Sequence, residues 1–272
     1  MASALKAIGF VLALGLLVPG PVAGRVRPGD ELRVCADPNN LPFSNRAGDG
    51  FENRIATIVA RAMGRRVVYT WWPQRRGFMR QTLRAGACDV VMGIPASFSQ
   101  AQPTQPYYRS SYVFVSRRDR HLALSSLDDP RLAHMRIGIQ MTGNDYDNPP
   151  PAQALAAKHL IDNVRGFMVY GDYTTPAPQQ DVINAVVDRR VDVAIVWGPV
   201  AGYFARRAST PLDIAIVSPR STQPLPFSFS IAMGVRRDDH TLRDALNAAI
   251  STHRREIRSV LRAYAVPLVD AP

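Results

Sequence analysis

Two stretches of the chain share one pattern, RAGACDVVMGIP at residues 84–95 and DRRVDVAIVWGP at residues 188–199. Each reads as the end of a helix, then an aspartate that opens a hydrophobic strand, then glycine or proline where the strand finishes. In open α/β sheets the carboxyl ends of the strands face the ligand crevice. Two copies of the pattern therefore predict two similar lobes whose loops face a shared cleft.

Strand-like and helix-like segments alternate outward from these two stretches, which favours an α/β fold with mostly parallel sheets. Asp49 and Glu52 have capping-box spacing just before the first helix. The expected strands are 32–36, 67–70, 90–94, 112–116, 136–140, 167–170, 191–196, 213–217 and 228–235. The expected helices are 52–63, 75–85, 151–163, 179–189 and 199–208, followed by basic helical segments to about residue 264.

Residues 1–24 have the features of a secretory signal peptide. Lys6 supplies the positive start, Ile8 to Val18 carries no charge, and small residues follow a Pro-Gly-Pro break. The apolar run is shorter than the roughly 20 residues that a helix needs to cross a bilayer. An uncleaved anchor is the alternative. We expect a periplasmic protein with no membrane span after cleavage.

The composition excludes several classes of protein. Of 272 residues, 46% are hydrophobic and 20% are charged, which is typical of a globular chain and not of a disordered or collagenous one. The formal net charge of +11 could indicate nucleic-acid binding. An exported protein rarely meets nucleic acid, so an acidic protein partner or an anionic surface fits this charge better.

The chain has two cysteines, Cys35 and Cys88, each in a strand-like run. In an oxidising compartment such a pair favours a disulfide, and the alternative is two buried, inert thiols. In the chain-entropy model, closing a loop of about 50 residues stabilises the fold by roughly 4 kcal/mol.

Motifs for catalysis and metal binding are missing from the sequence. It contains no phosphate-binding loop, GxGxxG, GxSxG or HExxH motif, and its five histidines are scattered. Residues 144–148, Asn-Asp-Tyr-Asp-Asn, offer oxygen ligands but are ordinary turn residues. We predict no metal, no cofactor and no enzymatic activity. A catalytic base at Asp37 is a minor alternative, because nothing positions a partner for it.

Four further segments carry a resemblance to a known family: CADPNNLPFSN at 35–45, GFEN at 50–53, WWPQRRGF at 71–78 and PYYRSSYVFV at 106–115. With the two lobe repeats, they resemble the periplasmic solute-binding proteins of the amino-acid-binding kind. More narrowly, they resemble the branch associated with quinoprotein methanol dehydrogenases, the MxaJ/XoxJ type. The resemblance covers essentially the whole chain after the signal segment.

The resemblance implies a periplasmic-binding-protein-like α/β fold, with two α/β lobes joined by two hinge strands around a central cleft. Lobe one would comprise residues 25–116 and 227–272, and lobe two residues 117–226. The hinge strands would lie near 112–117 and 228–235, and closure about such hinges around a ligand is a common motion. Proteins of this kind are usually monomers, and we expect a monomer.

Three positions depart from the amino-acid-binding pattern. Residues 96–102 lack the arginine that would bind a carboxylate, and Gln140-Met141-Thr142-Gly143-Asn144 replaces the usual Gly-Ser/Thr loop. Trp197 stands where an aspartate would bind the α-amino group. A free amino acid would lose its charge-assisted hydrogen bonds in such a cleft, so we do not expect one as ligand.

The residues that we expect to line the cleft combine aromatic rings with a few polar groups, which suits a flat or apolar ligand or a protein segment. The alternatives are that Phe43, Trp72 and Tyr108 belong to the lobe core, that Arg75 and Arg76 are solvated, and that Asp37 is a turn residue. The full set is Asp37, Asn39, Asn40, Phe43, Trp72, Gln74, Arg75, Arg76, Tyr107, Tyr108, Gln140, Thr142 and Trp197.

The resemblance implies a non-catalytic periplasmic accessory protein of a methanol dehydrogenase that uses pyrroloquinoline quinone (PQQ). Its partners would be the dehydrogenase and, as a second candidate, the cytochrome c of that system, and it would support assembly or activation of the enzyme. The alternative function is a solute receptor that delivers a small molecule, other than a free amino acid, to an ABC importer.

Overall fold

The computed structural model describes residues 29–141, 149–168, 174–218, 221–222 and 225–270. The predicted signal segment 1–24, Thr142 and the loop 144–148 lie outside the described residues. Among the described residues, no helix is long and apolar enough to cross a membrane.

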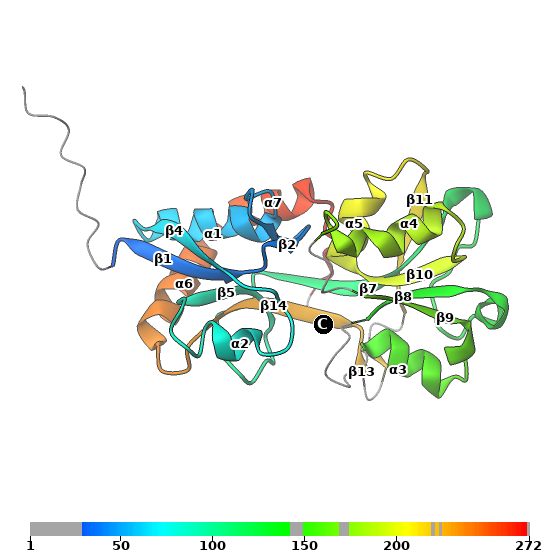
Figure 1. The fold of residues 1–272 in the computed structure, drawn as a ribbon, viewed down its shortest axis with the longest axis horizontal. Coiled ribbons are helices and arrows are strands. Elements are labelled where there is room, and N and C mark those ends of the chain that lie inside the picture. Colours follow the sequence, from blue (N-terminus) through cyan, green and yellow to red (C-terminus); the bar gives the residue numbers. More distant parts are fainter. Residues whose placement is uncertain (1–28, 142–148, 169–173, 219–220, 223–224, 271–272) are drawn as a thin grey trace, which may run out of the picture.

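The first lobe is built on four strands in the order β4-β1-β5-β14 (Figure 1). Strand β1 is parallel to β4 and β5, and β14 is antiparallel to β5. The main strands are β1 (Glu31–Ala36), β4 (Arg66–Trp71), β5 (Val90–Pro95) and β14 (Ser228–Val235), with short β2 (Asn39–Asn40), β3 (Ser44–Asn45) and β6 (Gln102–Pro103). The helices are α1 (Phe51–Ala62), α2 (Phe78–Gln81), α6 (His240–Thr252) and α7 (Arg254–Ala263).

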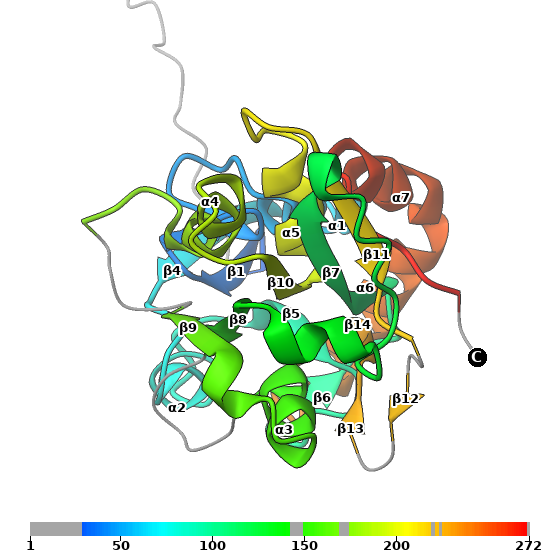
Figure 2. The same ribbon diagram turned by 90° about the vertical axis from the view of Figure 1, so that its right-hand side faces the viewer.

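The second lobe repeats this arrangement around β10, which is parallel to β8 and antiparallel to β7. Figure 2 shows its helices on opposite faces of the sheet, α4 and α5 on one and α3 on the other. The strands are β7 (Tyr108–Arg117), β8 (Ile137–Met141), β9 (Val164–Met168), β10 (Val193–Trp197) and β11 (Leu212–Ile216), with short β12 (Ser221–Thr222) and β13 (Leu225–Pro226). The helices are α3 (Pro150–Ala157), α4 (Asp181–Val187) and α5 (Gly198–Ala205), with 3₁₀ turns η1 (Arg118–Arg120), η2 (Pro130–His134), η3 (Ile161–Asn163) and η4 (Pro178–Gln180).

Strands β7 and β14 connect the two lobes, and Figure 1 shows both running between them. The first part of β7 pairs with β14, from Tyr108 to Ser111. The rest of β7 pairs with β10 and β11 in the second lobe. The fold is therefore the periplasmic-binding-protein-like α/β architecture that the sequence predicted, with two connecting strands. The residue limits of the lobes stay a prediction.

The hydrophobic core runs through both lobes. Helix α1 buries one apolar face, including Ile55, Ile58 and Val59, in the same cluster as residues of α4, α5 and α7. A C-terminal ring, Tyr264, stacks on Tyr203 of α5 with centroids 5.5 Å apart. The end of the chain thus fastens the first lobe to the second beside the two connecting strands.

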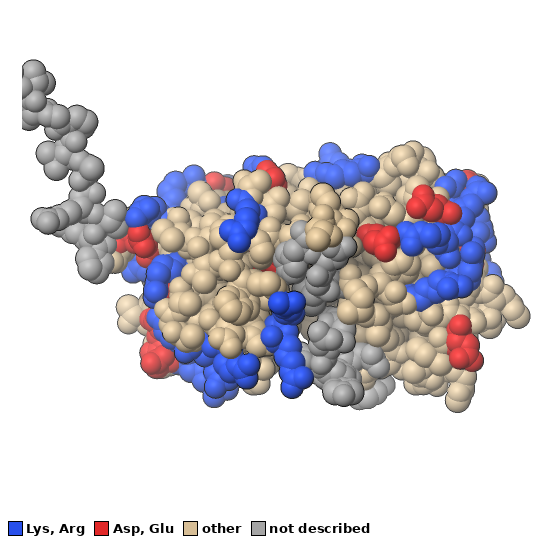
Figure 3. All heavy atoms as spheres, in the orientation of Figure 1, with Lys and Arg blue, Asp and Glu red and all other residues tan. Residues whose placement is uncertain are grey.

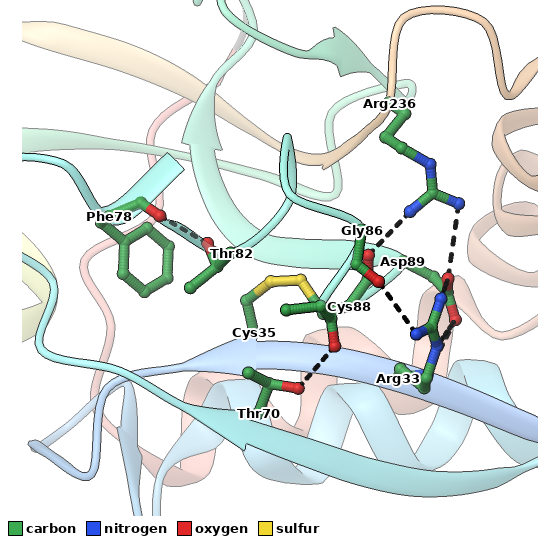
Figure 4. The surroundings of a disulfide bond; sticks show 10 residues. Arg33, Cys35, Thr70, Phe78, Thr82, Gly86, Cys88, Asp89 and Arg236 are labelled. Carbon is green, nitrogen blue, oxygen red and sulfur yellow. Dashed lines mark hydrogen bonds and ion pairs between the residues drawn. A yellow bond between two sulfur atoms is a disulfide. The ribbon is translucent and has the colours of Figure 1, made fainter. Parts of the chain in front are cut away.

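A disulfide joins Cys35 on β1 to Cys88 just before β5, with their Cα atoms 5.5 Å apart (Figure 4). The neighbouring Asp89 receives hydrogen bonds from Arg33 and Arg236. Burial works against ionisation of Asp89, but the Arg33 guanidinium outweighs it and the pKa of the carboxyl is lowered. The sequence-based prediction of the disulfide is confirmed, and it ties together two parallel strands of the first lobe.

Several predicted element limits are wrong. The helix predicted at 75–85 is confined to α2, because Gly77 before it is left-handed with φ of 88°. The helix predicted at 151–163 ends at Ala157, because His159 is left-handed with φ of 58°. The strand predicted at 167–170 starts earlier, as β9 begins at Val164, and residues 169–170 lie outside the described residues.

The cap of α1 also differs from the prediction. The N-cap is Gly50, and the side chain of Asn53 accepts hydrogen bonds from the backbone N–H groups of Gly50 and Asn45, each at 3.1 Å. Asn53 takes this role because it stands three residues after the true N-cap. Glu52 is thereby left free to turn inward.

Candidate functional site

A cavity of about 340 Å³ lies between the two lobes. The carboxyl ends of β5 and β10 both contribute to its wall, through Pro95 and Trp197, as the paired repeats predicted. The lining residues are Asn40, Phe43, Glu52, Gln74, Gly93, Pro95, Tyr108, Tyr112, Gln140, Pro149, Gln179, Trp197, Phe229 and Ile231.

Aromatic rings form much of the cavity wall. Trp197 packs edge-on against Tyr112 and Phe229, with centroids 5.3 and 5.9 Å apart. Tyr108, at the start of the connecting strand β7, adds a further ring to the wall. Phe43 packs on Phe51 at 5.3 Å, so it belongs to the wall and borders the core at the same time. Edge-to-face contacts between rings contribute stabilisation beyond the area that they bury.

Four side-chain amides form a continuous chain across the cleft, here called the amide chain: Gln74, Asn40, Gln179 and Gln140. Asn40 donates to Gln74 at 3.0 Å within the first lobe. Gln179 of the second lobe donates to Asn40, and Gln140 donates to Gln179 at 3.0 Å. The backbone N–H of Trp197 donates to Gln140 at 3.2 Å and completes the series. The protein's own side chains therefore bridge the two lobes.

Asn39 makes a second bridge between the lobes. Its Nδ2 donates to the carbonyl of Thr175 at 2.9 Å, and its Oδ1 accepts from the backbone N–H of Ala177 at 3.1 Å. Together with the amide chain, these bonds hold the cleft in a closed arrangement. Neutral hydrogen bonds of this kind each contribute about 1 kcal/mol net.

Asp37 does not line the cavity. It is buried, and its two carboxylate oxygens accept hydrogen bonds from the backbone N–H groups of Asn39 at 2.8 Å and Gln74 at 2.6 Å. Its backbone carbonyl accepts from Ser44 at 2.8 Å. Asp37 thus shapes the loop that carries two amides of the cleft, which matches the turn-residue alternative.

Five more of the expected residues lie outside the cavity wall, and one of them is Asn39, which bridges the lobes as described above. Trp72 is 40% exposed, and Arg75 and Arg76 are exposed next to it. Tyr107 points its hydroxyl to the carbonyl of Met92 at 3.2 Å, inside the first lobe. Of the WWPQRRGF segment, Gln74 alone among the described residues contributes to the wall. The two arginines that follow Gln74 are exposed to solvent. Asn40, Phe43, Gln74, Tyr108, Gln140 and Trp197 line the cavity, and a ligand role for any of them stays a prediction.

Glu52 is the main cavity residue that the sequence analysis missed. Its carboxyl lies against the backbone of β5, where a side chain at Gly93 would collide with it. Burial raises the pKa of this carboxyl to about 8. The side chain keeps some exposed area because it faces the cavity, yet protein surrounds it on the other sides. The signal was present in GFEN at 50–53, but its glutamate was assigned to a helix cap.

Gln179 was also missed, because a 3₁₀ turn carries it into the cleft from a segment predicted as ordinary helix. Tyr112 and Phe229 come from the connecting strands, where strand periodicity cannot tell cleft-facing from core-facing positions. Among the described residues, no group of histidine, cysteine or carboxylate side chains could hold a metal ion.

The cavity wall carries no pair of opposite charges for an α-amino acid. Among its described residues Glu52 is the one charged side chain, and no arginine, lysine or histidine contributes. The chemistry available is aromatic contact, amide hydrogen bonding and one acid. This arrangement suits neutral or cationic groups and disfavours a carboxylate.

The chain matches the model of the bacterial extracellular solute-binding proteins, family 3, over residues 32–261. It belongs to that family. Protein MoxJ of Methylorubrum extorquens is 34% identical over 249 residues, covering 88% of this chain and 81% of MoxJ. Protein MoxJ of Paracoccus denitrificans is 27% identical over 256 residues, covering 88% of this chain and 90% of that protein.

Solved structures agree with this placement. The structure of the periplasmic binding protein XoxJ of Methylobacterium extorquens AM1 superposes on this chain with a TM-score of 0.72 and 35% sequence identity. The match covers 88% of this chain and 100% of XoxJ. This family-3 chain therefore falls in the MxaJ/XoxJ-like branch, as its motifs predicted.

Proposed function

We propose that this chain is a non-catalytic periplasmic accessory protein of a PQQ-dependent methanol dehydrogenase system, and that it supports assembly or activation of the dehydrogenase by binding to it. The relatives of the MoxJ, MxaJ and XoxJ kind suggest association with methanol dehydrogenase systems. The family and these relatives also suggest a periplasmic location.

One observation carries the proposal: the cleft closes on the protein's own amides. In a solute receptor, the ligand supplies the contacts that join the lobes, and its binding energy drives closure. Here Gln179, Asn40 and the backbone near Ala177 supply those contacts themselves. A fold whose lobes are joined in this way without a ligand presents a fixed outer surface, which suits protein binding.

The outer surface is strongly basic, and basic side chains gather at both ends of the face shown in Figure 3. The exposed face of helix α7 is also basic. It carries four arginines, here called the α7 basic face: Arg254, Arg255, Arg258 and Arg262. Among the described residues none of these four guanidiniums has an ion-pair partner, whereas Arg61 beside them is paired with Glu256. Unpaired arginines on one helix face are suited to an acidic protein surface.

The test is binding of the mature protein to purified PQQ methanol dehydrogenase at low and moderate salt. We expect saturable binding that weakens as salt rises, because exposed charges are screened over about 10 Å at 0.1 M. Reversing two charges of the α7 basic face, in the double variant Arg258→Glu and Arg262→Glu, should weaken binding by at least tenfold, about 1.4 kcal/mol.

The matched control is the double variant Arg165→Glu and Arg206→Glu in the second lobe, which makes the same change in net charge at exposed arginines. We expect this control to lose only the small part of the affinity that depends on the net charge of the protein, and therefore much less than the α7 variant loses. Equal losses in both variants would show that the dehydrogenase responds to charge alone and would contradict docking through α7. No binding at either salt would overturn the proposed function.

A further inference from the structure

Glu52 has no counter-charge within the cavity. Among the described residues of the wall it is the single charged group, and no hydrogen bond or ion pair to its carboxyl is found among the described residues. Burying an acid without a partner is costly, so such a group either holds a proton or awaits a cation. The proposed accessory role makes no use of it.

The rings around the cavity are of the kind that attract cations. Five of the lining residues are aromatic, Phe43, Tyr108, Tyr112, Trp197 and Phe229, and they come from both lobes. The face of an aromatic ring carries negative potential and attracts an ammonium group, and tryptophan does so most strongly. Aromatic rings together with one buried carboxylate form the chemistry that recognises alkylated ammonium ions.

The remaining wall narrows the choice of ligand. The amides of Asn40, Gln74, Gln140 and Gln179 are hydrogen-bonded to one another and carry no charge, so the described wall offers no positive group to an anion. A carboxylate or phosphate would meet Glu52 with no arginine to offset the repulsion. A cation that needs few hydrogen bonds is the ligand class best matched to this surface.

We propose that the cavity is a binding site for a small alkylated ammonium ion, with Glu52 as its counter-ion and the aromatic side chains of both lobes around it. Gly93 belongs to this site, since its missing side chain gives the Glu52 carboxyl its place against β5. The cavity, about 340 Å³, has room for an ion the size of choline.

The binding should depend on pH. The titratable groups that face Glu52 are Tyr107 just before β7, Tyr108 on β7 and Tyr69 on β4. Burial raises the pKa of all three hydroxyls above their ordinary value of 10, so they stay neutral from pH 6 to 9. With the pKa of Glu52 at about 8, the ionised form is roughly one tenth of the protein at pH 7 and most of it at pH 9. The affinity for a cation should therefore rise about tenfold over that range.

The experiment compares choline with 3,3-dimethyl-1-butanol, its uncharged isostere, by isothermal titration calorimetry at pH 7 and pH 9. We expect choline to bind more tightly than the alcohol at pH 9, and about tenfold less tightly at pH 7 than at pH 9. Proton release on choline binding at pH 7 should appear as a dependence of the heat on the buffer.

At pH 9, where Glu52 is ionised, the variant Glu52→Gln should weaken choline binding by roughly 30-fold or more while leaving the alcohol unaffected. Glu31→Gln, which neutralises a glutamate on β1 that pairs with Arg66 outside the cavity, is the matched control and should bind choline as the parent does. Equal affinity for choline and the alcohol, no binding of choline at pH 9, or full binding by Glu52→Gln would each overturn the proposal. None of these results bears on binding to the dehydrogenase, so the two proposals fail independently.

Discussion

Replacing Gln179 by methionine should open the cleft. The side chain of Gln179 is buried and donates to Asn40 of the first lobe while accepting from Gln140. Methionine has a similar length and fills the same space, but it makes neither hydrogen bond. The change therefore removes one bond that exists only when the lobes meet, the bond to Asn40, and one bond within the second lobe, the bond from Gln140.

The size of the effect follows from the number of bonds lost. Each neutral hydrogen bond contributes about 1 kcal/mol net, and only the bond to Asn40 joins the lobes, so the closed state loses about 1 kcal/mol relative to the open one. When the cleft opens, the amide groups that were bonded across it can form hydrogen bonds to water. The net free energy lost per bond is therefore no larger than this. The ratio of closed to open protein should fall roughly fivefold.

Two assays report this ratio. The backbone N–H of Ala177 donates to Asn39 across the cleft, so its hydrogen exchange requires the lobes to separate. Its exchange rate should rise roughly fivefold in Gln179→Met, and small-angle scattering should show a larger radius of gyration. Gln180→Met, next in sequence and bonded to Asn184 of α4 within the second lobe, is the control and should change neither. An unchanged Ala177 rate in Gln179→Met would refute the view that the amide chain holds the cleft closed.

Three further predictions concern stability. Reduction of the disulfide, which spans 53 residues of sequence, should lower the free energy of unfolding in urea by about 4 kcal/mol, and an unchanged midpoint would contradict this. The Arg136 guanidinium lowers the pKa of Asp192 from 3.8 to about 2, so this carboxylate stabilises the fold above pH 4 and the gain is lost as pH falls toward 2. Asp192→Asn should cost about 1 kcal/mol at pH 7, given that Arg136 is half exposed, and the difference from the parent should vanish near pH 2 in acid unfolding. Gly93→Ala should destabilise the fold by about 1–3 kcal/mol by displacing the Glu52 carboxyl, and a Glu52→Ala background should remove most of that loss; additive losses would exclude the contact.

The sequence predicted the layered fold well because hydrophobic runs mark buried strands. Strands β1, β5, β10 and β14 lie where the repeats and apolar runs placed them, and the carboxyl ends of β5 and β10 do meet at the cavity. The errors came from backbone conformation: Gly77 and His159 are left-handed and end or delay helices that periodicity alone extended.

The candidate site was predicted in part because its residues depend on how distant segments meet. Asn40 and Trp197 follow strands whose ends are visible in the sequence, so their place at the cleft could be inferred. Gln179 reaches the cleft through a 3₁₀ turn, and Glu52 turns inward because Asn53 caps α1 in its place. Neither position leaves a periodic pattern in the sequence, so the three-dimensional structure is needed to place Gln179 and Glu52 at the cleft.

The most direct test of the account is to purify methanol dehydrogenase from the native host with and without the gene for this chain. The account predicts that dehydrogenase from cells lacking the chain is reduced in specific activity or incompletely assembled, and that the gene restores it. Fully active, normally assembled dehydrogenase from such cells would contradict the accessory role.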